Sequence, residues 1–141
     1  QPGKVFATPG WRVIKDRGSL LIEPVQEAVK PLLEIKEHPY TPDFMIPRNK
    51  ATACFDADKL QHPLSLRLCR QGDSFVPFGM KGRKKVSDYL TDRKFSILHK
   101  ERQWVLCCGD DIIWLVGERV DNRFRIDEKT RKVLVVSTID Q

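Results

Sequence analysis

Residues 104–116 read WVLCCGDDIIWLV, and this stretch decides the middle of the fold. Its two apolar runs, WVLCC and IIWLV, flank the turn residues Gly109 and Asp110, which predicts a β-hairpin. Both runs are apolar at consecutive positions, so each strand is expected to be buried on both faces. The sequence therefore predicts a hairpin that lies in the centre of the molecule.

Other β-leaning runs surround this hairpin along the chain. They are bounded by turn residues and are typical of strands: ATACFD at 51–56, LSLRL at 64–68 and KVLVVSTI at 132–139. Residues 84–91 indicate a helix with one apolar face, and Ser96 is placed to cap a second short helix. We expect an α+β fold with two layers of mostly antiparallel strands, similar to a sandwich or barrel, and two short inserted helices.

The first 50 residues are predicted to form a strand-rich segment before the main domain. Short runs broken by Pro and Gly favour a meander of hairpins at 4–8, 11–15 and 19–23. Residues 32–37 alternate apolar and charged side chains, which predicts a half-buried strand. Prolines concentrate in residues 38–50, where we expect a linker or an ordered crossover. The predicted domains are therefore residues 1–50 and residues 51–141.

The net charge of +6 is concentrated in one segment of the chain. Residues 67–102 hold ten Lys or Arg against four Asp or Glu, whereas the residues before them hold nine against eight and those after them six against seven. A localised basic field favours a polyanionic partner more than a generally basic surface does. The sequence therefore predicts that this segment faces a polyanion.

The densest basic run is GMKGRKK at 79–85, where four of the last five residues are cations. Gly79 and Gly82 allow the backbone to approach phosphates closely, and a helix after Lys85 would add its positive N-terminal dipole. A charge run of this kind is also typical of an ordinary solvated surface. From the residues alone, phosphate binding and a solvated surface both stay open.

Motifs for catalysis and for metal binding are absent from the sequence. There is no P-loop, no G-x-G-x-x-G, no H-E-x-x-H and no G-x-S-x-G, so we expect no catalytic residue and no cofactor in this chain. The four cysteines form no C-x-x-C pair, which predicts reduced thiols and no metal site. Reduced thiols are typical of the cytoplasm, where we expect the protein, and no apolar run approaches the roughly 20 residues that span a membrane.

The stretch from Phe55 onward resembles the C-terminal domain of bacterial tRNA(Ile)-lysidine synthetases. Its core pattern, GD-x-F-x-P-x-GM-x-G-x-KK-x-x-D, is long and specific. Four segments carry the resemblance: FDADKL at 55–60, LSLRLCRQGDSFVPFGMKGRKKVSDYLTDRK at 64–94, IIWLVGERVDNRF at 112–124 and EKTRKVLVV at 128–136.

The resemblance implies a function as well as a fold. Members of this family use ATP to join lysine to the wobble cytidine of an isoleucine tRNA with a CAU anticodon. Their activity belongs to an N-terminal PP-loop domain, whose S-G-G-x-D-S motif is absent here. The chain begins at Gln1 without an initiator Met, so we expect the non-catalytic C-terminal part of such an enzyme, with ATP, Mg and lysine bound elsewhere. In the family this part is a tRNA-binding domain that helps hold the acceptor end, and its fold is similar to a domain of the phenylalanyl-tRNA synthetase β chain.

The resemblance also assigns candidate site residues. We expect the basic positions of its GD and GM-x-G segments to contact the tRNA backbone. In this sequence they fall on Arg67, Arg70, Lys81, Arg83, Lys84 and Lys85. Second-rank candidates for RNA contact are Lys94, Arg102 and Arg119. Three glycines are expected to serve backbone geometry: Gly72, Gly79 and Gly82. Asp73 is expected to buttress a turn or pair with an arginine, and Phe78 is the aromatic side chain that we most readily expect at the surface.

A hypothesis from another class is a structural role. In that role the strands form the interface of a homodimer and position the catalytic domain without touching RNA. A chain that sediments as a dimer and does not bind tRNA would favour this hypothesis.

Overall fold

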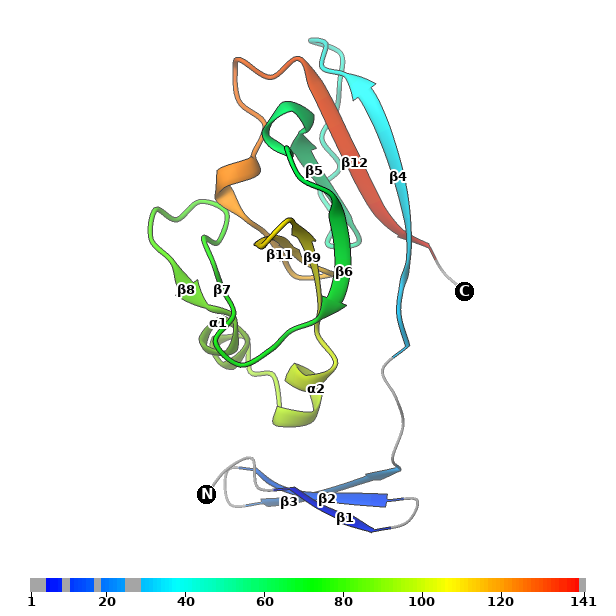
Figure 1. Ribbon diagram of the computed structural model, residues 1–141, viewed down its shortest axis with the longest axis vertical. Coiled ribbons are helices and arrows are strands. Elements are labelled where there is room, and N and C mark those ends of the chain that lie inside the picture. The colour runs from blue at the N-terminus through cyan, green and yellow to red at the C-terminus, as the bar shows by residue number, and fades with distance from the viewer. Residues whose placement is uncertain (1–4, 9–10, 17–18, 25–28, 140–141) are drawn as a thin grey trace.

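The computed structural model describes residues 5–8, 11–16, 19–24 and 29–139. The first three ranges are strands: β1 (Val5–Thr8), β2 (Trp11–Asp16) and β3 (Ser19–Pro24). They pair antiparallel in the order β1-β2-β3 (Figure 1). The meander predicted for the start of the chain is therefore confirmed.

The predicted hairpin lies in the middle of a four-stranded antiparallel sheet with the order β11-β10-β9-β6. Its strands are β11 (Arg119–Val120), β10 (Asp111–Leu115), β9 (Trp104–Cys108) and β6 (Leu64–Leu68). In β9 and in β10, every residue after the first is buried. The expectation of a central hairpin that is covered on both faces is confirmed.

A three-stranded antiparallel sheet covers one face of the central sheet. It has the order β4-β12-β5 and consists of β4 (Leu32–Pro39), β12 (Lys132–Ile139) and β5 (Thr52–Asp56), the last followed by the 3-10 helix η1 (Ala57–Lys59). Phe55 of β5 and Val136 of β12 belong to the same buried cluster as Ile113 and Trp114 of β10. These two layers of antiparallel strands confirm the predicted architecture.

Two short helices and a two-stranded ribbon cover the opposite face. These elements are β7 (Ser74–Phe75), β8 (Lys84–Lys85), α1 (Val86–Asp92) and α2 (Ile97–Glu101). Phe75 and Leu90 share a second buried cluster with Val105 and Cys107 of β9, whereas the next residue, Cys108, belongs to the first cluster. Successive side chains of a strand point to opposite faces, so the central hairpin supports one core on each side.

The helix predicted at 84–91 begins two residues later than expected. Residues 84–85 pair with β7 as a strand, and α1 starts at Val86. The second helix is capped as predicted, because the Ser96 hydroxyl accepts a hydrogen bond from the His99 amide at 3.1 Å. The residues expected to form the apolar face of α1 are all buried: Val86, Tyr89 and Leu90. No helix in the described ranges is long and apolar enough to cross a membrane.

Strand β4 is more exposed than the half-buried strand predicted at 32–37. All eight of its residues pair with β12, but only Leu33 is partly buried, because β4 is the outer strand of its sheet. The Pro-rich stretch is an ordered crossover from β4 to β5, and the Tyr40 amide donates to the Arg131 carbonyl at 2.8 Å. The domain boundary near residue 50 stays a prediction, although the pairing of β4 with β12 joins this part of the chain to the last strand.

A buried carboxylate ties the central sheet to the segment after β7. Asp121 is fully buried, and its carboxylate accepts hydrogen bonds of 2.8–3.0 Å from the Val76 amide and from the amide and guanidinium of Arg123. The Asn122 amide donates a hydrogen bond of 2.7 Å to the Val76 carbonyl. Asn122 is the first residue of the 3-10 helix η2 (Asn122–Phe124). We call this set of contacts the Asp121 clamp. Because a buried carboxylate is costly unless its oxygens are paired, the clamp fixes both segments.

Replacing Asp121 by Ala is expected to destabilise the fold by about 3 kcal/mol, because the Val76 amide and the Arg123 guanidinium lose their acceptor. Urea unfolding of D121A and of the unchanged protein measures the difference in unfolding free energy.

Asp58→Ala is the matched control, because it removes only a 3.3 Å ion pair with Arg131 in which both side chains are at least half exposed. This control should cost less than about 1 kcal/mol. Equal losses in D121A and D58A would contradict a structural role for the clamp.

Candidate nucleic-acid interface

Arg67 on β6 is held by a two-pronged ion pair. Its guanidinium donates to both carboxylate oxygens of Asp73, at 2.8 and 3.0 Å, and to the Leu68 carbonyl at 3.1 Å. The hydrogen bond to Asp73 raises the pKa of Arg67 against the opposing effect of burial. Burial acts to raise the pKa of Asp73, but the hydrogen bonds from Arg67 and from the Arg70 amide outweigh it and lower that pKa. Most of the donor capacity of Arg67 is therefore used within the fold.

The Asp73 carboxylate also closes the turn between β6 and β7. The Arg70 amide donates to one of its oxygens at 2.6 Å, and the Asp73 amide donates to the Arg70 carbonyl at 3.1 Å. Gly72 has a φ of 90°, a left-handed conformation that glycine adopts without strain. Asp73 thus buttresses a turn and pairs with an arginine. The Arg70 side chain is exposed and makes no hydrogen bond to the described residues.

A tight turn leads into the basic loop. The Met80 amide donates to the Pro77 carbonyl at 2.9 Å, and Gly79 has a φ of 87°, as a type II turn requires at its third residue. The Phe78 amide donates to a β11 carbonyl at 3.0 Å, which fixes the turn against the central sheet. Gly82 adopts no left-handed conformation, and a Cβ there would meet nothing within 4 Å.

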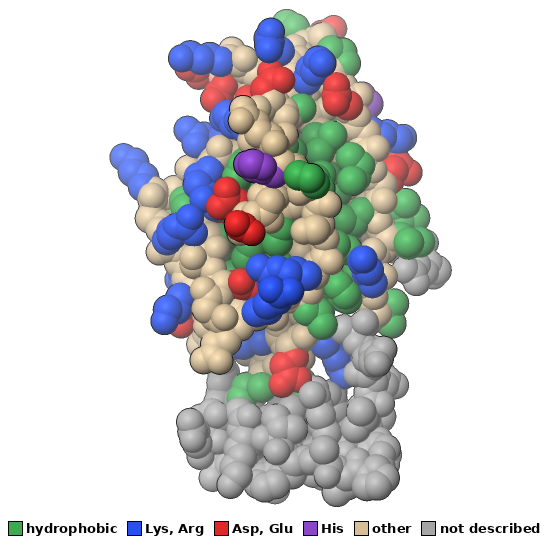
Figure 2. Space-filling model, in the orientation of Figure 1, with side chains coloured by type: hydrophobic (Ala, Val, Ile, Leu, Met, Phe, Trp, Pro, Cys, Tyr) green, Lys and Arg blue, Asp and Glu red, His purple; other side chains and the backbone are tan. Residues whose placement is uncertain are grey.

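The four cations of the basic loop have different surroundings. Lys84 forms an ion pair with Asp92 of α1, and Arg83 donates to a β7 hydroxyl at 3.1 Å. The side chains of Lys81 and Lys85 are exposed and have no ion-pair or hydrogen-bond partner within the described part of the chain. Figure 2 shows Lys and Arg side chains along its left-hand side, over the loop that precedes β8 in Figure 1.

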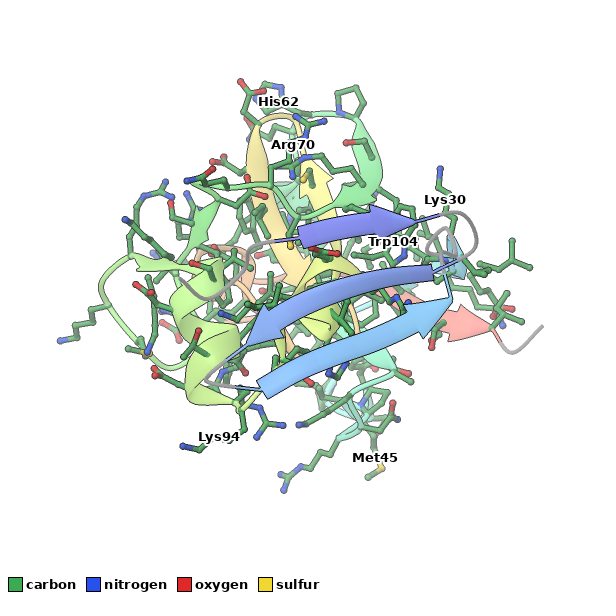
Figure 3. The ribbon with its side chains drawn as sticks, turned by 90° about the horizontal axis from the view of Figure 1, so that it is seen from below. Lys30, Met45, His62, Arg70, Lys94 and Trp104 are labelled. Carbon is green, nitrogen blue, oxygen red and sulfur yellow. The ribbon has the colours of Figure 1, made fainter. Side chains whose placement is uncertain are left out.

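The second-rank cations lie at three separate places. Arg119 donates to the Phe78 carbonyl at 2.6 Å and so supports the turn before the loop. Lys94 is exposed just after α1 with a φ of 68°, and Arg102 is exposed at the end of α2. Figure 3 shows Arg70 and Lys94 at opposite sides of the molecule. The predicted cations are therefore spread over the surface. Lys81 and Lys85 lie near the middle of the basic segment 67–102.

The cysteines contribute no reactive thiolate to this region. All four are free, and burial raises the pKa of the Cys54, Cys69 and Cys107 thiols. No group of three or more His, Cys, Asp or Glu in the described ranges is arranged to hold a metal ion.

Two features of this region were missed by the sequence predictions. One is the Asp121 clamp: Asp121, Asn122 and Arg123 lie in the VDNRF run at 120–124, but the run does not indicate that its carboxylate is buried or that its partner is Val76. The other is an apolar hollow beside Phe78, formed partly by residues of the Pro-rich crossover. A pattern of alternating side chains carries no signal for contacts between such distant segments.

Solved structures share this fold. The crystal structure of a TILS C-terminal domain matches with a TM-score of 0.59, covering 99% of this chain and 93% of that one at 19% identity. An N-terminal fragment of the phenylalanyl-tRNA synthetase β-subunit from Pyrococcus horikoshii matches with a TM-score of 0.54, covering 62% of this chain and 27% of that one, also at 19% identity. Both likenesses confirm the predicted type of domain, and at this identity they concern the fold alone.

Sequence comparison defines the family within that fold. A sequence profile of the family described as TilS substrate C-terminal domain matches residues 64–137, which is more than half of the chain. The chain belongs to this family.

Two relatives extend the match over nearly the whole chain. The tRNA(Ile)-lysidine synthase of Bacteroides thetaiotaomicron is 60% identical over 143 residues, covering 99% of this chain and 34% of that protein. The tRNA(Ile)-lysidine synthase of Parabacteroides distasonis is 49% identical over 152 residues, covering 97% of this chain and 35% of that protein. The chain thus spans about a third of the length of these curated relatives and matches their C-terminal region.

Asp73→Asn is expected to lower the unfolding free energy by about 1–3 kcal/mol near neutral pH, because the side-chain amide cannot accept both hydrogen bonds from the Arg67 guanidinium. The folded pKa of Asp73 is lowered, so its contribution is present above the ordinary value of about 3.9 and is lost as pH falls through the folded pKa. The gap between the unchanged protein and D73N should therefore shrink in acid.

Urea unfolding over a pH series checks this expectation. Asp92→Asn serves as control, because Asp92 is paired with Lys84 but is 64% exposed. A gap between the unchanged protein and D73N that stays constant down to the lowest pH would contradict the role of the charged pair.

Proposed function

We propose that this chain is the C-terminal, non-catalytic tRNA-binding part of an ATP-dependent tRNA(Ile)-lysidine synthase. Such an enzyme attaches lysine to the wobble cytidine of an isoleucine tRNA with a CAU anticodon. The proposal is supported by the names of the relatives that match nearly the whole chain. ATP, Mg and lysine would be bound by the N-terminal part of such an enzyme, and the protein would work in the cytoplasm beside its tRNA substrate.

The observation that carries tRNA binding is the charge of the basic loop. Lys81 and Lys85 are exposed and unpaired within the described ranges, in the segment that holds ten cations against four anions. Cations without internal partners remain available to neutralise phosphates and to release the counterions that surround RNA.

The cations of this segment differ in how available their charge is to RNA phosphates. Arg67 and Lys84 already neutralise carboxylates of the fold, so their contact with phosphate competes with Asp73 and Asp92. Lys81 and Lys85 meet no such competition. We therefore propose that these two lysines, with Arg70, make the main phosphate contacts. In the full enzyme these contacts would lie near the acceptor end of the tRNA.

Replacing Lys81 and Lys85 together by Ala should weaken tRNA binding and lower the slope of log K against log salt by about two. A gel-shift titration of an isoleucine tRNA transcript at several salt concentrations measures both quantities. The control is the double variant K36A/K132A, which removes two lysines that pair with glutamates of β4. Unchanged affinity in K81A/K85A, or equal weakening in the control, would contradict the assignment of the loop.

The structural alternative has one observation in its favour. The outer edge of β4 pairs with no other strand among the described residues, and apolar side chains near it are exposed: Leu32 (54%), Ile35 (48%) and Ile139 (43%). An open edge of this kind is a template for pairing with a second copy of the chain.

A homodimer through β4 is tested by sedimentation. Ile35→Lys should convert a dimer to a monomer, because it places a charge at the apolar edge. A chain that is monomeric at all concentrations would exclude this alternative, and a dimer without tRNA affinity would favour it over RNA binding.

A further inference from the structure

An apolar groove lies beside the turn that leads into the basic loop. A hollow of about 220 Å³ is lined mainly by apolar side chains, including Ile46, Ala53, Val120 and Ile126, and Phe78 forms one of its walls. A second hollow of about 210 Å³ adjoins it and shares Thr52, Phe78 and Val120. We call the two hollows together the Phe78 groove.

Phe78 is presented to this groove by its backbone. Its amide donates to the Val120 carbonyl at 3.0 Å, and its carbonyl accepts from Arg119 at 2.6 Å. The following Gly79 takes the left-handed conformation that closes the turn, and its amide donates to the Asn122 side chain at 3.1 Å. Phe78 is nevertheless 46% exposed. Because the backbone that carries the ring is fixed before binding, the turn loses little conformational entropy when a ligand binds.

Among the described residues, three cations line the groove beside its apolar side chains. Arg125 lines the first hollow, and Lys50 and Arg119 line the second. The one acid in these linings, Glu118, is paired with Arg93 at 3.0 Å. The basic loop begins at Gly79, directly after Phe78 in the chain. Apolar walls with a cationic rim suit a ligand that has a flat, weakly polar ring and a negative charge beside it.

We propose that the Phe78 groove binds one unpaired nucleotide of RNA, with its base stacked on Phe78 and its phosphates beside Lys50, Arg119 and Arg125. Base stacking on an aromatic side chain is the general means by which proteins hold single-stranded nucleic acid, and it tolerates any base. The alternative occupant, an apolar segment of protein, would leave the exposed charges of Lys50 and Arg125 without an anionic partner. The inference rests on the proposed tRNA-binding function and adds to it a site for an unpaired base.

Titration with short RNAs tests the groove separately from the basic loop. The probes are a single-stranded oligoadenylate of about eight nucleotides and an RNA duplex of the same length. Phe78→Ala should weaken binding of the oligoadenylate about tenfold and leave duplex binding unchanged, because a duplex has no unstacked base to offer. Phe78→Trp should keep the affinity, and the fluorescence of the added indole should be quenched when the oligoadenylate binds.

Met80→Ala is the matched control. Met80 is 45% exposed, is apolar, lies in the same turn and lines neither hollow. It should leave binding of both probes unchanged, and thermal unfolding of each variant verifies that the fold is intact.

The outcomes separate this inference from the proposed function. If F78A binds the oligoadenylate normally while K81A/K85A weakens tRNA binding, the groove holds no base and the proposed function stands. If the unchanged protein binds neither RNA probe nor tRNA at low salt, both proposals fall. If F78A changes only the sedimentation of the chain, the groove seats protein and the inference is overturned.

Discussion

The carboxylate of Asp121 is the constraint on which the candidate interface depends. A carboxylate with no exposure to solvent must be surrounded by donors, and here those donors come from Val76 and Arg123. The requirement joins the end of β11 to the segment after β7, so the Pro77–Met80 turn has only one position against the central sheet. The position of this turn also determines where the ring of Phe78 and the lysines that follow it lie.

The basic charge of residues 67–102 divides into two kinds of cation. Arg67 is paired with Asp73 and holds the β6–β7 turn, and Lys84 is paired with Asp92 and ties β8 to the last residue of α1. Lys81 and Lys85 are available to a ligand because no carboxylate of the described ranges pairs with them. A strand pattern explains part of this division: on β8, Lys84 is partly buried and its neighbour Lys85 is exposed, since neighbours face opposite sides. Charge density in the sequence therefore overstates the charge that faces a partner.

The sequence predicted the elements of this fold better than their partners. The hairpin of β9 and β10, the buried face of α1 and the Ser96 cap depend on residues close together in the chain, and all three are confirmed. The start of α1 was misplaced, because the pairing of residues 84–85 with β7 outweighs their helix propensity. The exposure of β4 was misjudged because alternation shows which side chains share a face and does not show whether the strand lies at an edge. The Asp121 clamp left no local signal at all.

The Phe78 groove shows why a site of this kind is hidden in a sequence. Its walls come from the Pro-rich crossover, from β5, from the turn at Phe78 and from the residues around β11, which meet only in the folded chain. The crossover has its place because β4 pairs with β12 at one end of it and β5 pairs with β12 at the other. Proline restricts the backbone of this connection, so its ordering costs less entropy than that of a flexible loop. A segment that resembles a linker by composition thus acts as a wall, and the stability of the β4-β12-β5 sheet controls the shape of the groove.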